Sequence, residues 1–191
     1  SAIRAMDVQS RAGFEYLDAW GLFATGEYPP DIVSVMTPER RKRLKRLFRA
    51  ARDRHIKIMF GMGLMTWGFD RILQANEHLR GYSIKPDGQK EMMSHAMCGA
   101  KEESWSYVYK ILDFAMSEFD FGGVHLESAD QGWCGCPECG GKYGTVGYNC
   151  RINIRCADYI KSKWPGKIVT SIPINWTTTQ FTEQEKAEII A

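Results

Sequence analysis

The alternation of short apolar runs with longer amphipathic segments constrains the fold of this chain more than any other feature of its sequence. Short apolar runs typical of strands occur at residues 3–8, 56–60, 124–126 and 168–172. Between them lie segments in which apolar residues recur every three or four positions, a spacing typical of helices. Because regular alternation of strands and helices favours parallel strands joined by crossover helices, the sequence predicts an α/β fold of about four βα units.

The predicted helices fill the intervals between these strands. The first begins at Thr37, a capping residue, and is followed by Pro38 at the first helical position and by Glu39, whose charge suits the helix dipole. Further helices are expected at residues 69–80, 102–119 and 149–163, and from Thr182 onward, where a capping box occurs; residues 81–99 are expected to be irregular.

The composition predicts a globular domain and excludes several function classes. The chain has 191 residues, 44% of them hydrophobic, with a net charge of +2, which argues against a nucleic-acid partner. The longest apolar run is too short to cross a membrane. Neither a G-x-G-x-x-G nor a Walker sequence follows any predicted strand, so we expect no nucleotide cofactor.

The two ends of the sequence suggest an excised piece. The opening Ser-Ala-Ile-Arg does not look like a native start, and the closing residues stop within a predicted helix. We therefore expect residues 1–191 to form a single domain that belongs to a larger barrel, truncated at both ends. No targeting segment is visible, which leaves the compartment open, with an intracellular one our expectation.

Glu127 is the first candidate for a catalytic residue. It falls where the predicted strand 124–126 runs out, and Asp130 lies three residues further on. In α/β proteins the loops that follow parallel strands converge on the ligand, so a carboxylate at a strand end faces the binding crevice. The alternative is that Glu127 or Asp130 merely caps the loop or the next helix.

Residues 133–139, Trp-Cys-Gly-Cys-Pro-Glu-Cys, place three thiols on one tight loop as a C-x-C-x-x-C pattern. Cys134, Cys136 and Cys139 are candidate zinc ligands, because zinc is usually held by four N or S atoms in a tetrahedron. Reduced structural thiols and disulfides are the alternatives. The fourth ligand stays open in the sequence, with four candidates: Cys98, Cys150, Cys156 and His125.

Other candidate substrate-binding residues lie at or just beyond the ends of the predicted strands. They are Trp67, Asp70, His125, Asn175 and Trp176. Tryptophan rings stack on the apolar faces of sugars, and carboxylate or amide groups bind sugar hydroxyls. For a loop tryptophan such as Trp67, plain packing is the alternative interpretation.

The stretches MFGMGLMTWGFDRILQANEHLRG and MCGAKEESWSYVYKILDFAMSEFDFGGVHLESADQGWCGCPEC carry a family resemblance. They resemble the barrel core of glycoside-hydrolase-like proteins that are distantly similar to alpha-glucuronidases and beta-hexosaminidases. The resemblance covers roughly residues 55–176. It implies an eight-fold TIM-type (β/α) barrel whose proton-donating carboxylate follows the fourth strand, which corresponds to Glu127. The Asn-Glu or Asp-Glu pair of many such enzymes is replaced here by Leu126-Glu127.

The sequence therefore predicts a partial barrel from a carbohydrate-active hydrolase, a glycosidase with Glu127 as general acid and Asp130 as its nearest carboxylate partner. The alternatives are a non-catalytic sugar-binding or assembly module with a structural metal loop, and a hydrolase that uses the metal in catalysis.

Four units cannot close a barrel. We therefore expect further chain segments or a second copy to cover an apolar inner face formed by the hydrophobic residues of the strands: Ile58, Phe60, Val124, Leu126, Val169 and Ile172.

Overall fold

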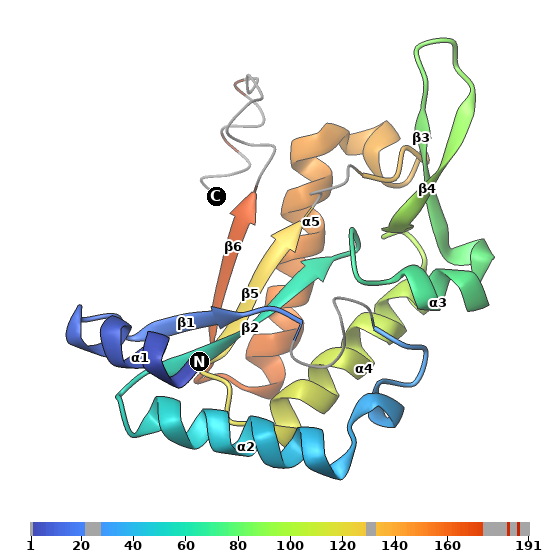
Figure 1. Cartoon of the computed structure of the whole chain (residues 1–191). Helices are drawn as coiled ribbons and strands as arrows, with labels where there is room; N and C mark the ends of the chain where they lie inside the picture. Colours follow the sequence, from blue (N-terminus) through green and yellow to red (C-terminus); the bar gives the residue numbers. More distant parts are fainter. Residues whose placement is uncertain (1, 22–27, 129–132, 174–182, 184–186, 188–191) are drawn as a thin grey trace.

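The centre of the molecule is a parallel four-stranded sheet. The computed structural model describes residues 2–21, 28–128 and 133–173, together with residues 183 and 187. The strand order is β1-β2-β5-β6, and all three pairings are parallel (Figure 1). The strands are β1 (Tyr16–Ala19), β2 (Lys57–Leu64), β5 (Gly123–Ser128) and β6 (Ile168–Pro173). The predicted fold of four parallel strands is confirmed.

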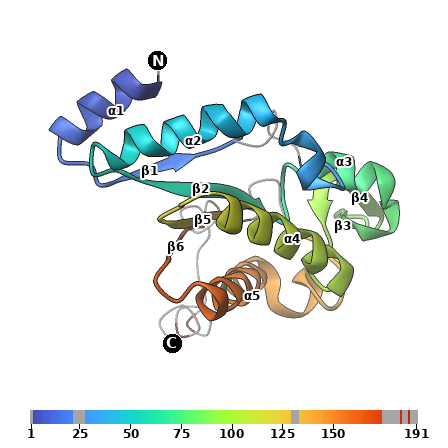
Figure 2. The ribbon, with the colours of Figure 1, turned by 90° about the horizontal axis from the view of Figure 1, so that it is seen from below.

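Helices connect these strands and cover one side of the sheet. They are α1 (Ala2–Arg11), α2 (Pro38–Arg52), α3 (Asp70–Ala75), α4 (Glu102–Glu118) and α5 (Gly140–Lys163), with the 3-10 turns η1 (Ile32–Val35) and η2 (Glu77–Leu79). Figure 2 shows α2, α4 and α5 along the same side of the sheet. The predicted start of α2 is confirmed, because Thr37 Oγ1 accepts a hydrogen bond from the Arg40 N–H at 3.2 Å. Among the described residues, no helix is both long and apolar enough to cross a membrane.

The helices bury the face of the sheet that was predicted to need a partner. Ile58 and Phe60 of β2 and Val124 and Leu126 of β5 are at most 1% exposed and belong to the core cluster that includes α4 and α5 residues. The expectation that a further segment or a second copy must cover these four side chains is wrong, because the chain's own helices cover them. Side chains alternate between the two faces of a strand, and the apolar set points to the helices. On β6, Val169 is partly buried against the same core, whereas Ile172 is 51% exposed.

The first strand lies later in the chain than predicted. Residues 3–8 fall within helix α1, where Met6 is the buried residue, and the strand is formed instead by Tyr16–Ala19 in the following aromatic segment. The sequence of α1 is rich in good helix formers, and a short apolar run does not by itself separate a helix from a strand. The number of parallel strands is unaffected. β1 and β6 form the edges of the described sheet, so the need for covering segments there stays a prediction.

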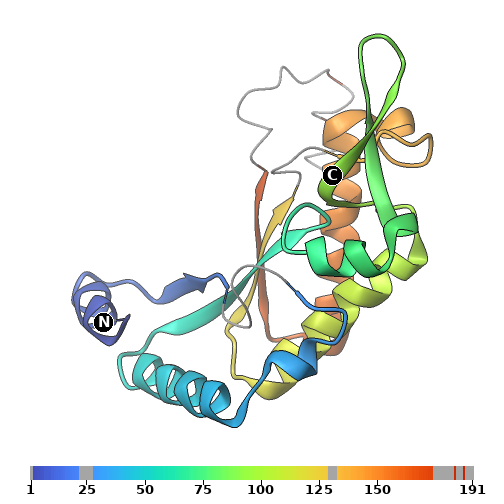
Figure 3. The ribbon, with the colours of Figure 1, turned by 45° about the vertical axis from the view of Figure 1, so that its right-hand side comes forward.

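A β-hairpin occupies the stretch that was expected to be irregular. β3 (Arg80–Ile84) and β4 (Lys90–Met97) pair in antiparallel fashion, with a bulge between Arg80 and Tyr82. Figure 3 shows the hairpin extending beyond the sheet, beside the first part of α5. The side chains of residues 84–92, at and around its tip, are exposed, so no regular apolar alternation marks it in the sequence.

Helix α5 also begins earlier than predicted, at Gly140 rather than near residue 149. Its first turns contain several glycines, which have a low helix propensity and read as a turn in the sequence. The early start places the N-terminus of α5 directly after Cys139, the last cysteine of the loop.

Candidate functional site

Glu127 lies where the sequence placed it, at the carboxyl end of β5. The strand register sets it opposite Gly63 of β2 and Ile172 of β6, in the middle of the described sheet. Because Leu126 points to the helices, the alternation of side chains directs Glu127 to the other face, together with His125. The Glu127 side chain is partly exposed, as expected of a group that meets a ligand.

Two tryptophans lie flat on this same face of β2. A Cβ atom added to Gly61 would lie 2.6 Å from the ring of Trp20, and one added to Gly63 would lie 2.5 Å from the ring of Trp67. The two ring centroids are 5.2 Å apart. Only glycine lets the rings approach the strand this closely, so Gly61 and Gly63 form a track on which Trp20 and Trp67 rest.

Trp20 is a site residue that sequence reasoning missed. It follows β1, whose last residue, Ala19, pairs with Phe60, so continuation of the register brings Trp20 beside Gly61. The signal was present as an aromatic residue after a strand, but the strand itself was misplaced. Trp67, by contrast, was predicted and is confirmed to lie at this end of the sheet.

His125 is buried on this face and makes polar contacts across the sheet. It is 6% exposed; its Nδ1 lies 2.7 Å from Thr170 Oγ1 on β6 and 3.8 Å from Asp18 Oδ2 on β1. Its ring also meets Trp20 edge-on, with centroids 5.8 Å apart. His125 therefore links three strands, and it does not belong to the group of cysteines described below. We call Trp20, Trp67, Gly61, Gly63 and His125 the tryptophan face.

Asp70 and His95 form a second polar pair near the carboxyl end of β2. Asp70 is the first residue of α3, and its Oδ1 contacts Nδ1 of His95, which lies on β4. The Asp70 side chain is 20% exposed and that of His95 is 43% exposed. The hairpin thus places His95 against Asp70. The two residues are far apart in the sequence, so no local pattern predicts this contact.

Four cysteines come together beside the hairpin. Cys134, Cys136 and Cys139 are joined by Cys98, which directly follows β4, and their sulfur atoms all lie within 4.8 Å of one another. Cys98 Sγ is 3.7 Å from Cys136 Sγ and 3.9 Å from Cys139 Sγ. All four are buried free thiols. This cysteine cluster could hold a metal ion, and Cys98 is the fourth member that the sequence left open.

Crowding divides the acidities of these thiols. Hydrogen bonds from Cys139 and then from Cys98 lower the pKa of Cys134. The contact with Cys134 raises the pKa of Cys139, and it is also the largest cause that raises the pKa of Cys98. The close sulfur contacts thus shift the pKa values of these thiols in opposite directions, and a cation bound by all four sulfurs would displace their protons.

Three predicted site residues, Asp130, Asn175 and Trp176, lie outside the described residues.

A groove of about 840 Å³ lies at the amino ends of the strands, where Ile56, Gly122 and Lys167 line it. That is the end of the sheet opposite Glu127. In barrel enzymes the loops at the carboxyl ends of the strands form the active site, so this end, and not the groove, is the candidate site.

Solved structures match the fold. No protein-family model and no curated protein sequence matches the chain. A beta-N-acetylhexosaminidase from Bacteroides fragilis is 18% identical, with a TM-score of 0.60, over 89% of this chain and 38% of its own. One from Streptomyces coelicolor is 13% identical, with a TM-score of 0.53, over 98% of this chain and 41% of its own. A maltogenic alpha-amylase from Thermotoga neapolitana is 12% identical, with a TM-score of 0.56, over 89% of this chain and 40% of its own.

These likenesses establish the fold. The chain spans about two fifths of the length of the solved structures named above. It has the architecture of part of a TIM-type (β/α) barrel, which confirms the predicted fold and a distant resemblance in fold to beta-hexosaminidases.

Proposed function

We propose that this chain carries the general acid of a glycosidase and that Glu127 is that acid. The observation that carries the proposal is the placement of Glu127 at the carboxyl end of a central strand, on the same sheet face as Trp20 and Trp67. A carboxyl group that can protonate the leaving oxygen, beside partly exposed aromatic rings on which a sugar can stack, suits cleavage of a sugar–oxygen bond. The fold likeness to beta-N-acetylhexosaminidases and alpha-amylases supports the same reaction class.

The chemistry needs two carboxyl groups. One protonates the leaving oxygen, and a second activates water or attacks the anomeric carbon. Glu127 takes the first role in this proposal. Asp130, three residues later in the chain, is the proposed second group, either as a catalytic partner or as a ligand of a sugar hydroxyl.

The remaining candidates take substrate-binding roles. Trp67 presents ring surface on which a sugar stacks. His125, on the same sheet face, is held in place by its contact with Thr170. Asp70, held by His95, offers a carboxylate to a sugar hydroxyl. Asn175 and Trp176, which follow β6 in the sequence, are proposed to bind the sugar as well.

The experiment is the substitution Glu127→Gln in the parent protein, assayed on two glycosides that differ only in the leaving group. Removal of a general acid should lower turnover of a glycoside with a poor, alkoxide-type leaving group by ~10²-fold or more. Turnover of the matching nitrophenyl glycoside should fall much less, because nitrophenolate leaves without a proton.

Glu39→Gln, on the exposed first turn of α2, is the matched control. Equal losses on both glycosides would indicate that Glu127 is not the acid. Sugar binding without turnover by the wild-type protein would instead favour the non-catalytic sugar-binding module.

We also propose that the cysteine cluster holds one zinc ion with a structural role. Four buried sulfur donors suit zinc, and an all-thiolate set leaves no open position for substrate, which argues against a catalytic metal. Elemental analysis should find about one zinc per chain. Metal-free protein with titratable thiols would contradict this proposal and leave that for Glu127 intact.

A further inference from the structure

The cysteine cluster joins two parts of the chain that are distant in sequence. Cys98 ends the hairpin, whereas the other three cysteines lie on the loop between β5 and α5. We infer that a single metal ion on these four thiolates is a latch that fastens the hairpin to this loop, with Cys98 as the ligand that closes it. The inference rests on the zinc site proposed above and assigns that site its role.

The sulfur positions suit a tetrahedral ion. A zinc–sulfur bond of about 2.3 Å in a regular tetrahedron places neighbouring sulfurs about 3.8 Å apart. The distances from Cys98 Sγ to two of the loop sulfurs are 3.7 and 3.9 Å. The Cys98 sulfur therefore already lies at the separation from the Cys136 and Cys139 sulfurs that a shared zinc ion would set, although no sequence motif connects Cys98 to them.

The backbone beside the cluster is built for close approach. The Gly135 N–H donates a 2.6 Å hydrogen bond to the carbonyl of Tyr82 on β3. A Cβ atom on Gly81 would lie 3.2 Å from Cys134 Cβ, and one on Gly135 would lie 3.2 Å from the side chain of Ile84. A glycine on each side lets the loop run against β3, which brings the thiols together independently of their chemistry.

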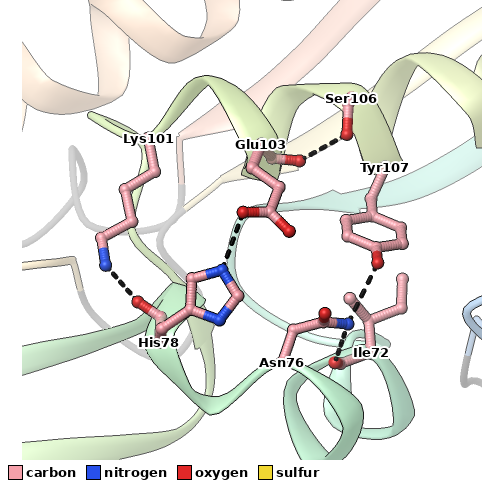
Figure 4. Close-up of polar contacts among 7 residues, drawn as sticks. All are labelled: Ile72, Asn76, His78, Lys101, Glu103, Ser106 and Tyr107. Atoms are coloured by element: carbon pink, nitrogen blue, oxygen red, sulfur yellow. Dashed lines mark hydrogen bonds and ion pairs between the residues drawn. The ribbon is translucent and has the colours of Figure 1, made fainter.

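The segment that leads into the hairpin, residues 76–79, has its own attachment to α4. Figure 4 shows the contacts: His78 Nε2 lies 2.7 Å from Glu103 Oε2, and the Asn76 side-chain amide donates to the Tyr107 hydroxyl at 3.0 Å. Lys101 Nζ donates to the His78 carbonyl. These contacts hold η2, before β3, whereas the cysteine cluster joins the end of β4 to the loop between β5 and α5.

The latch bears on the candidate site through His95. This residue lies on β4, three positions before Cys98, and contacts Asp70. Between them, the Met97 N–H donates to the Met65 carbonyl in the loop after β2, at 2.9 Å. A metal ion bound to Cys98 therefore fixes β4, the strand that positions His95 against Asp70. Loss of the ion should loosen this strand while the parallel sheet stays folded.

The test uses Co²⁺ as a spectroscopic probe in the wild-type chain and in two cysteine variants. Wild-type protein should bind one Co²⁺ with the intense visible and charge-transfer bands of a tetrahedral tetrathiolate. Cys98→Ser should weaken Co²⁺ binding by ~10²-fold or more and shift these bands, because one charged ligand is lost. Cys150→Ser, a half-exposed thiol on α5 outside the cluster, is the matched control and should match wild type.

Hydrogen exchange on zinc-loaded and chelated wild-type protein tests the latch without a variant. Chelation should speed exchange in residues 80–97 and 133–139, whereas β2 and β5 should keep their protection. Wild-type Co²⁺ binding and spectra in Cys98→Ser, or unchanged exchange in both segments, would overturn the latch while the zinc site stands. Absence of metal binding by wild-type protein would remove both, and neither result bears on the leaving-group assay of Glu127.

Discussion

The tryptophan face and the cysteine cluster are built by different physical means. On the tryptophan face, the pairing of β2 with β5 fixes where the residues lie. One parallel register sets Gly61 beside His125, and it also sets Gly63 beside Glu127, next to this face. In the cluster, a hairpin and a loop meet, and no shared strand register fixes their distance. The tryptophan face should therefore stay folded on the backbone hydrogen bonds of the sheet. The geometry of the cysteine cluster depends instead on side chains and on the ion proposed to join them.

The glycine track should be the most sensitive part of the tryptophan face. Gly63→Ala places a Cβ atom where the Trp67 ring lies, and overpacking of this kind costs about 1–3 kcal/mol in unfolding free energy. Gly166→Ala is the control, because nothing lies within 4 Å of the added atom. Urea unfolding followed by tryptophan fluorescence measures both. Equal stability of the two variants would show that the rings do not rest on the track.

The next effect concerns the link between β5 and β6. Thr170→Val keeps the shape of the side chain and removes the hydroxyl that contacts His125 Nδ1, which should lower the unfolding free energy by about 1 kcal/mol. The affinity of the cysteine cluster for Co²⁺ should not change, because neither Thr170 nor His125 belongs to that cluster. A variant that loses metal binding as well would show that the regions are coupled.

The smallest effect is expected from a surface pair between two helices, Glu102 of α4 and Arg155 of α5. The hydrogen bond from Arg155 lowers the pKa of Glu102, so this carboxylate contributes stability above its ordinary value of 4.5 and loses it as the pH falls through the folded value. Glu102→Gln should therefore reduce the steepness of the fall in melting temperature between about pH 5 and pH 3. The change should be slight because the pair is exposed. Identical acid limbs in the two proteins would contradict this.

Local patterns in the sequence were sufficient for three of the four parallel strands, for most of the helices and for the place of Glu127. The stretch 119–128 illustrates why: a helix end, two glycines and a short apolar run are all local signals, and the register of a parallel strand then sets which side chain points where. The same signals failed at residues 3–8, where a short apolar run belongs to a helix, and at Gly140, where a glycine-rich helix start resembles a turn.

By itself, the sequence determined that a barrel-like α/β unit carries a carboxylate at a strand end and three thiols on the loop that follows. Only the tertiary structure decided which face of the sheet is covered, that Trp20 joins Trp67 there, and that Cys98 completes the cluster. The physical reason is that periodicity encodes neighbours along the chain, whereas Trp20 beside Gly61 and Cys98 beside Cys136 are contacts made by the packing of separate elements. Their distance in sequence leaves no local pattern from which either contact could be predicted.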